Sequence, residues 1–509
     1  MTTAYEDQKI FYGDIHNHCS IGYGHGSIED AYQNGKLQLD FACVTPHAHW
    51  GDMPEDEKRL ENVLAYHKRG FEIANKKWLY VQDVVESNYE PGSFVSFLGS
   101  EWHSMRHGDR NIVFNGSKGE IITADSLDDL HNELRNLAKQ GIRSFAFAHH
   151  IGYKTGYRGI NWNTFDANFS PLVEIMSMHG ASESDDASYP YLHTMGPRDG
   201  SSTYHHGLSQ GHIVGVFGST DHHSAHPGSY GHGRMAVWSK ALTRSGIWDA
   251  IQNRRTYALT GDRIALEFSL NDSQMGSVIP YVDKREINVK INGGDLIDYV
   301  EIIHNQKAVY CWKGGEPDNH VVPEGNMKVY LEVGWANKNE IVEWDVELEL
   351  IGGELLSVEP RFRGPEVVAP TSNTIEKYVF STLKKQENSS VSFSTQTWGN
   401  PTTTTASTQG VCLELDVNHE SQLKGKINDT PIDLKIFEIA QISKVGYLGG
   451  FLSPAYKFHR AVPENLYTTS FSFNHHSEGL QMDYYMVRVK QKNGQWAWSS
   501  PIWVKPEKH

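Results

Sequence analysis

Short apolar runs alternate with amphipathic segments along the first half of the chain, and we interpret them as strands and helices. The predicted strands are residues 9–16, 39–47, 93–103, 111–116, 143–150, 172–180 and 212–223. Helical spacing of apolar positions predicts helices at residues 27–38, 55–77, 125–140 and 244–254. Asp125 and Ser126 are candidate caps of the third helix, which closes at Gly141. This alternation is typical of parallel βα units, in a sheet or barrel covered by helices.

After about residue 263 the pattern changes to alternating short strands with turns rich in Gly, Asn and Asp. The clearest of these strands are residues 285–291, 298–304, 328–334, 342–350, 484–491 and 501–505. The pattern predicts an antiparallel β-sandwich. We therefore expect an α/β domain at residues 1–262 and an all-β domain at 263–509, with inserted loops around 385–410. Within that Ser/Thr-rich stretch, "VSFSTQTW" alternates and could equally be a strand.

The composition describes an ordinary globular protein, with 39% apolar and 21% charged residues. A net charge of −16 and the lack of a basic cluster interleaved with aromatics argue against nucleic-acid binding. The four cysteines lack C-x-x-C spacing, and neither a signal sequence nor a membrane-spanning run is visible. We expect a cytoplasmic protein that acts on a small molecule or an oligosaccharide, with no membrane partner; the sequence leaves a homo-oligomer open.

Histidine is concentrated in the first half, where 20 of the 27 histidines lie in residues 1–262. Asp14, His16 and His18 alternate directly after an apolar run, so in a strand they would point the same way. Five predicted strands end in His, Asp or Glu, in "GDIHNH", "TPHAH", "GSEWH", "AHH" and "STDHH". In an α/β barrel these ends share one face, and burying so many imidazoles and carboxylates together favours divalent metal ions.

These motifs, in this order, resemble the PHP superfamily of polymerase and histidinol phosphatase modules. "GDIHNH" resembles its D-x-H-x-H, "VTPHAH" its T-D-H, "FLGSEWH" its G-x-E, "FAHH" its P-H and "GSTDHH" its S-D-x-H. The resemblance covers about residues 10–262. Together with "RRTYALTG" and "QWAWSSPIWV", it is similar to a branch known mainly as a domain of unknown function. It implies a distorted seven-stranded β/α barrel that binds two or three Zn, Mn or Fe ions.

Carried over by position, the resemblance implies three groups of ligands. His16, His18, Glu101 and Asp221 would hold one ion. Glu101 would bridge to a second ion held by His150 and His107, with His179 as the competitor of His107. His25, His47 and His223 would hold the third ion.

Two departures from the family pattern affect the surroundings of the ligands. Pro46 stands where the family has the Asp of T-D-H, and His149 stands where it has the Pro of P-H. Asp14 is expected to orient a ligand rather than to touch metal. Glu101, His150 and Asp221 are the candidate catalytic residues.

Two ions bridged by a carboxylate would activate water, which predicts a hydrolase of small esters, with a phosphate ester as the first expectation. Arg110, Tyr153, Lys154 and Arg158 are candidate substrate-binding residues. Cations are few near the motifs and aromatic residues are many, so a carbohydrate-directed hydrolase or a polysaccharide or uronate lyase remains an alternative. A non-catalytic binding protein is the second alternative.

Overall fold

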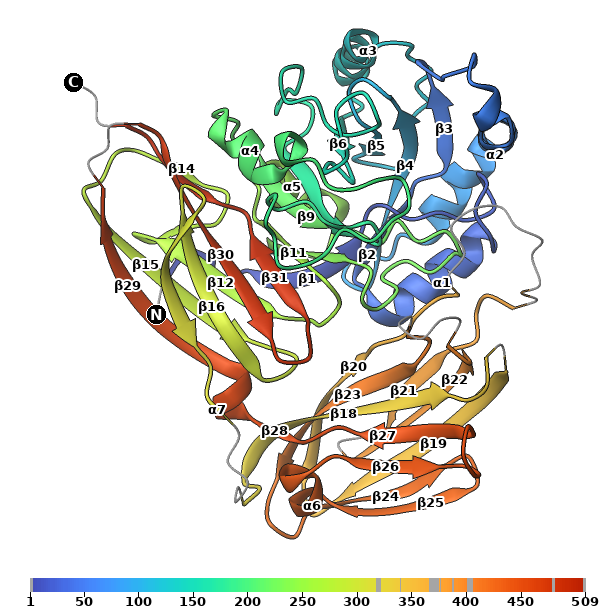
Figure 1. The fold of residues 1–509 in the computed structure, drawn as a ribbon, viewed down its shortest axis with the longest axis vertical. Helices are drawn as coiled ribbons and strands as arrows, with labels where there is room; N and C mark the ends of the chain where they lie inside the picture. The colour runs from blue at the N-terminus through green and yellow to red at the C-terminus, as the bar shows by residue number, and fades with distance from the viewer. Residues whose placement is uncertain are drawn as a thin grey trace.

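This computed structural model describes residues 3–316, 322–338, 340–365, 375, 377–386, 389–400, 406–477 and 481–506. Residues 9–259 form a lobe of helices and strands, which we call the α/β lobe and which is coloured blue to green in Figure 1. Its helices are α1 (Ile28–Gln38), α2 (Glu61–Ser87), α3 (Leu127–Lys139), α4 (Tyr204–Ser209) and α5 (Arg244–Gln252). Its strands are β1 (Lys9–Asp14), β2 (Phe41–Val44), β3 (His47–Trp50), β4 (Val95–His103), β5 (Arg110–Phe114), β6 (Ser144–Ala148), β7 (Leu172–Ser177), β8 (Gly180–Ala181), β9 (Gly215–Gly218), β10 (Arg234–Ser239) and β11 (Thr256–Leu259).

The helices begin where the local sequence supplies a cap. The Ser27 side chain accepts a hydrogen bond from the Asp30 backbone N–H, and the Asp30 carboxylate accepts one from the Ser27 backbone N–H. At α3, Ser126 is the cap and accepts from Asp129 N–H, as one of the two candidates predicted. Helix α2 extends ten residues beyond the predicted end at 77, to Ser87.

The strands of the α/β lobe form a mixed sheet in the order β11–β10–β1–β2–β4–β5–β6–β7–β9. The pairs β1–β2, β2–β4, β6–β7 and β7–β9 are parallel, as the alternation predicts. Strand β5 is antiparallel to both of its neighbours, because a short turn through Gly108 leads back from β4 without a crossover helix. The fold is therefore mixed α/β. No ladder among the described residues joins β9 to β10 or β1, and closure into a seven-stranded barrel stays a prediction.

A second lobe, the first β-lobe, consists of residues 265–313 and 468–504. Its strands are β12 (Ala265–Leu270), β13 (Ser273–Gln274), β14 (Val278–Ile279), β15 (Lys284–Asn292), β16 (Ile297–His304), β17 (Lys307–Lys313), β29 (Thr468–His476), β30 (Asp483–Gln491), β31 (Trp496–Ser499) and β32 (Ile502–Val504). Strand β31 pairs with β11, so one 17-stranded sheet runs from the α/β lobe into this lobe. Figure 1 shows the red C-terminal strands lying beside β11.

Residues 325–467 form a third lobe between β17 and β29, the inserted β-lobe, at the bottom of Figure 1. Its elements are β18 (Gly325–Trp335), β19 (Ile341–Ile351), β20 (Glu354–Pro360), β21 (Thr382–Gln386), β22 (Ser390–Trp398), β23 (Gln409–Val417), β24 (Gln422–Ile427), β25 (Thr430–Lys435), α6 (Ile436–Gln441), β26 (Lys444–Tyr447), β27 (Pro454–Phe458), β28 (Val462–Pro463) and α7 (Glu464–Tyr467). A six-stranded and a five-stranded sheet share one apolar core.

The antiparallel β-structure predicted after residue 263 is thus divided between two lobes. The stretch "VSFSTQTW" is strand β22, with buried and less buried positions in strict alternation. Of the region around 385–410, residues 387–388 and 401–405 lie outside the described residues. The boundary predicted at residue 262 stays a prediction. No helix among the described residues is long and apolar enough to span a membrane.

A buried ion pair fastens the first β-lobe to the α/β lobe. Arg488 of β30 contacts both carboxylate oxygens of Glu183, at 2.9 and 3.0 Å, and also donates to Glu301. The Trp498 indole N–H donates to Glu183 as well. Glu183 lies two residues after the end of β8. The ion pair therefore fixes the start of the loop that follows β8.

We expect Arg488→Met to destabilise the protein by about 3 kcal/mol, because Glu183 would remain buried without its cation. Lys490→Met, in the same strand but with a partly exposed pair to Asp298, should cost less than about 1 kcal/mol. Urea denaturation measures both variants. Equal losses would show that the Arg488–Glu183 pair contributes no more than a surface contact.

Candidate metal centre

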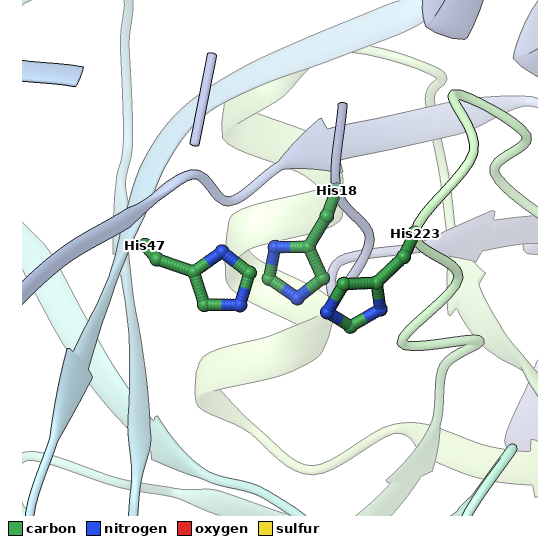
Figure 2. A group of neighbouring side chains, drawn as sticks. All are labelled: His18, His47 and His223. Atoms are coloured by element: carbon green, nitrogen blue, oxygen red, sulfur yellow. The ribbon is translucent and has the colours of Figure 1, made fainter. Parts of the chain in front are cut away.

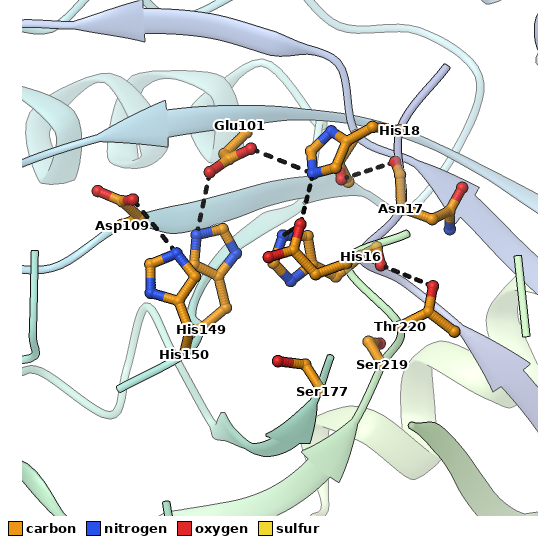
Figure 3. A network of polar contacts seen from close by, with 12 residues as sticks. His16, Asn17, His18, Glu101, Asp109, His149, His150, Ser177, Ser219 and Thr220 are labelled. Atoms are coloured by element: carbon orange, nitrogen blue, oxygen red, sulfur yellow. Dashed lines mark hydrogen bonds and ion pairs between the residues drawn. The ribbon is translucent and has the colours of Figure 1, made fainter. Parts of the chain in front are cut away.

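The predicted ligands gather at one edge of the sheet, where the parallel strands of the α/β lobe have their carboxyl ends. The loops that leave these strands and the carboxyl end of β4 place the buried side chains around a common centre (Figure 3). The predicted residues brought together there are His16, His18, His47, Glu101, His150, Asp221 and His223.

Asp14, the last residue of β1, ties two of these loops together. Its carboxylate accepts hydrogen bonds from the backbone N–H groups of His16, Thr220 and Gly228, at 3.0, 3.3 and 2.8 Å. The loop after β1 is thereby fixed against the loop after β9. Asp14 thus orients the backbone that carries His16, and it does not belong to the clusters of ligand atoms among the described residues.

Glu101 occupies the centre of the site, and its side chain is 3% exposed. One carboxylate oxygen lies 3.4 Å from His18 Nε2 and 3.2 Å from His47 Nε2, and the other lies 3.2 Å from His149 Nε2. Burial raises the pKa of this carboxyl well above its ordinary value. Among the described residues Oε2 has no hydrogen-bond donor, so this buried oxygen is unsatisfied by the protein itself.

Asp221 connects the imidazoles on the other side of the site. Its Oδ1 lies 3.0 Å from His18 Nε2 and 3.2 Å from His16 Nε2, and its Oδ2 lies 2.7 Å from His179 Nε2. Burial acts to raise the pKa of Asp221, but His16 and the other imidazoles outweigh it and hold the pKa well below the ordinary value. Its φ of 55° is in the left-handed region, a strain that functional sites commonly hold.

Two further groups complete the centre. His18, His47 and His223 turn their rings toward one another, and their ligand atoms lie within 4.8 Å of one another (Figure 2). Glu101, Asp109, His149 and His150 form a second such group, in which His150 Nε2 lies 3.4 Å from Asp109. Arg158 donates from Nε to Asp109 at 2.6 Å.

The donor set fits divalent transition-metal ions. Burial lowers the pKa of His47, His149 and His223 well below the ordinary value, so these imidazoles are neutral at pH 7 and can donate a lone pair. Buried ring nitrogens of His16, His47 and His149 have no hydrogen-bond partner among the described residues, and neither does the Glu101 oxygen. Imidazole combined with carboxylate is the ligand chemistry of Zn, Mn and Fe. These groups are therefore candidate metal ligands.

Several residues predicted as metal ligands or substrate contacts lie outside the described ligand groups. His107 is partly exposed and contacts the Thr164 hydroxyl at 2.9 Å, and neither it nor His25 is in a described ligand group. Buried Arg110 donates to the backbone carbonyls of its own turn, and Lys154 is exposed. The Tyr153 hydroxyl contacts His179 Nδ1 at 2.5 Å, so it orients a ring of the cluster.

The structure adds residues that the sequence reasoning assigned differently or missed. Asp109 was missed, and His103 was interpreted as orienting a ligand or facing substrate rather than as a ligand. His149 was interpreted as a departure from the family pattern, and His179 only as the competitor of His107. Glu174 of β7 was missed too, and its carboxylate lies 2.7 Å from His16 Nδ1. The signal for Glu174 was present in "LVEIMSMHG", where one charged residue interrupts an apolar strand that otherwise reads as buried.

A crevice of about 790 Å³ opens beside the cluster. Trp50 and Phe71 line it, and their rings lie 5.6 and 5.9 Å from the ring of His103. Glu55, Asp56 and Glu57 are also on its wall. The space next to the cluster is thus partly aromatic and partly acidic.

Comparison with known proteins identifies relatives without an assigned activity. The family model described as "Protein of unknown function (DUF3604)" matches residues 47–206 and 220–274. Uncharacterized proteins of Chlamydia pneumoniae and Chlamydia muridarum are 23% and 26% identical over 315 and 334 residues. These alignments cover 53% and 57% of this chain, and 50% and 51% of the relatives. The chain thus spans about half the length of the curated relatives it matches.

A solved structure from Bacteroides vulgatus is similar at a TM-score of 0.34 and 15% identity, over 59% of this chain and 80% of the other. That protein is described as a two-domain protein containing a predicted PHP-like metal-dependent phosphoesterase.

We expect Glu101→Gln to lose at least one metal equivalent, because the change keeps the size of the side chain but removes the charge that would offset the ions. In metal-free protein the same change should raise stability by about 1 kcal/mol or more, since a neutral amide is cheaper to bury than a carboxylate. Elemental analysis and urea denaturation measure the two effects. Glu133→Gln, at an exposed position of α3, is the control. Unchanged metal content in Glu101→Gln would place the bridging ligand elsewhere.

Proposed function

We propose that this protein is a hydrolase of the PHP type that uses two or three divalent transition-metal ions. The supporting observation is the Glu101 carboxylate, which is buried among imidazoles of three loops and has one oxygen without a donor among the described residues. Such a carboxylate is costly to keep unless cations lie beside it. We also propose that the α/β lobe is a closed seven-stranded barrel and that the protein is a member of the PHP superfamily.

The ligand groups suggest which residues would hold the ions. Each ion would take its ligands from one of five neighbouring groups, three of which contain Glu101. The groups are His18, His47 and His223; His16, His18 and Glu101; His47, Glu101 and His103; Glu101, Asp109, His149 and His150; and His150, His179 and Asp221. When bound, ions in such a site lower the pKa of water and neutralise the oxygens of a displacement reaction.

The charges around the centre favour more than one dication and an anionic substrate. Four carboxylates, those of Glu101, Asp109, Glu174 and Asp221, face the centre and are buried. Arg158 is the one Arg or Lys side chain in contact with them among the described residues. Two dications would reverse the net charge of this centre and three would leave it strongly positive, which suits the oxygens of a phosphate ester.

The protein's own groups would prepare this centre for substrate. Asp14 fixes the loops after β1 and β9, Tyr153 orients His179, and Glu174 orients His16. In the proposed reaction the oxygen of water adds to phosphorus and the water gives up a proton. The bond from phosphorus to the leaving oxygen breaks, and that oxygen takes up a proton to give the alcohol. We further propose a small substrate, because the crevice of about 790 Å³ beside the cluster has the size of a small-molecule site.

We expect metal-loaded protein to release inorganic phosphate from small phosphate esters, with one oxygen from isotope-labelled water in the products. The metal-free protein should lose this activity and regain it on addition of Zn, Mn or Fe. Phosphate assay and mass spectrometry measure the outcome. A lyase would instead give an unsaturated sugar that absorbs in the ultraviolet and contains no solvent oxygen. That product from uronate-containing oligosaccharides, without phosphate release, would refute the hydrolase.

A further inference from the structure

Arg158 stands at the rim of the metal centre with most of its guanidinium already engaged. Its Nε donates to Asp109 at 2.6 Å, and its Nη2 donates to His103 Nδ1 at 2.7 Å. The remaining nitrogen, Nη1, contacts the thioether sulfur of Met195 at 3.8 Å. A thioether is a weak acceptor, so Nη1 can exchange it for an anionic oxygen at little cost. The side chain is 15% exposed, which makes it accessible from solvent.

His193 provides a second donor on the same rim. Its ring stacks on His179 at a centroid distance of 4.0 Å and an interplanar angle of 20°. The Met195 backbone N–H donates to His193 Nδ1 at 3.1 Å, so Nδ1 is an acceptor and the ring proton lies on Nε2. The side chain is only partly buried.

One short turn positions both donors. Met195 fixes the tautomer of His193 through its backbone, and its sulfur lies against Arg158. The two donors come from separate loops, one after β6 and one after β8, and each rests on a side chain of the cluster: Arg158 on Asp109, and His193 on His179. The rim thus presents one cationic and one neutral N–H donor next to the candidate metal ligands.

We propose that Arg158 Nη1 and His193 Nε2 bind the non-bridging oxygens of a phosphate monoester whose phosphorus lies over the metal centre. This inference rests on the proposed function and names its substrate class. A monoester has three non-bridging oxygens and a diester has two. If metal ions engage two oxygens, only a monoester has a third one for donors at the rim. The adjacent crevice is lined by Glu55, Asp56, Glu57 and one cation, Lys68, which is paired with Glu55 at 2.7 Å. This wall keeps a net negative charge and disfavours a second anionic group, so the alcohol part is uncharged or cationic.

The test compares His193→Phe with the wild-type holoenzyme, using phenyl phosphate as substrate. Phenylalanine keeps the stacking on His179 but removes the N–H donor. We expect KM to rise about tenfold or more, the loss that removal of a hydrogen bond to a charged group produces, with a much smaller change in kcat. His193→Gln, which restores a donor, should recover part of the loss. His206→Phe, the same change on α4, should match the wild type.

A binding measurement separates this inference from the proposed function. Calorimetric titration of the metal-loaded protein with inorganic phosphate should show affinity about tenfold weaker in His193→Phe than in the wild type, at equal metal content. Weaker phosphate binding without any hydrolysis by the wild type would keep the recognition site and refute the hydrolase. Hydrolysis with unchanged KM and unchanged phosphate affinity in His193→Phe would overturn the recognition site alone. Loss of metal from His193→Phe, or a wild type that does not bind phosphate, would also overturn it.

Discussion

The burial of four carboxylates at one edge of a sheet is the constraint that organises this molecule. Glu101, Asp109, Glu174 and Asp221 are nearly inaccessible to solvent, and isolated carboxylates in such an interior are prohibitively costly. Part of the charge is offset by Arg158 and by His16, whose pKa is raised well above its ordinary value once the neighbouring carboxylates outweigh burial. The remaining imidazoles are kept neutral by burial. Burial raises the pKa of Glu101 and Glu174, so these two carboxyls resist ionisation unless cations lie beside them. When all four are ionised, the site carries more negative charge than Arg158 and His16 balance, and that surplus is why we infer metal ions.

The surrounding fold serves to hold several loops against one another. Parallel strands bring the loops after β1, β2, β6 and β9 to the same edge, and antiparallel β5 brings Asp109 to it from the amino end of a strand. Both β-lobes reach these loops. Arg488 anchors Glu183 in the loop after β8, and Gly364 of the inserted β-lobe packs so closely on His222 and His226 that a Cβ would come within 2.5 Å of each. Both β-lobes thus stabilise the loops that form the centre.

The sequence predicted those parts that depend on local pattern. Seven strands of the α/β lobe and the helices α1, α3 and α5 lie within a few residues of their expected positions, because apolar periodicity and caps are local signals. Helix α2 was also expected, but it extends ten residues beyond its predicted end. Residues immediately after strands, such as His16, His18 and Asp221, could be expected to converge for the same reason. Asp109 could not, since its position depends on the reversal of β5. For Glu174 the sequence shows a charged residue in a buried strand, but not which face of that strand points toward the site. Arg110 and Tyr153 show what local pattern leaves open. The Arg110 guanidinium donates to backbone carbonyls and the Tyr153 hydroxyl contacts an imidazole, and contact of either with substrate stays a prediction.

The position of the rim donors also explains how an acidic protein could accept an anion. A net charge of −16 would repel a dianion at long range, but ions screen exposed charges beyond about 8 Å at physiological ionic strength. Inside that distance an approaching phosphate meets Arg158, the N–H of His193, the metal-binding centre behind them and, on one side, the acidic wall of the adjacent crevice. Because His193 contributes a donor without a charge, and Arg158 is held by Asp109, the rim is only weakly cationic in the absence of metal. Affinity for an anion would then depend on metal occupancy, so that the protein would select its substrate only when the centre is loaded.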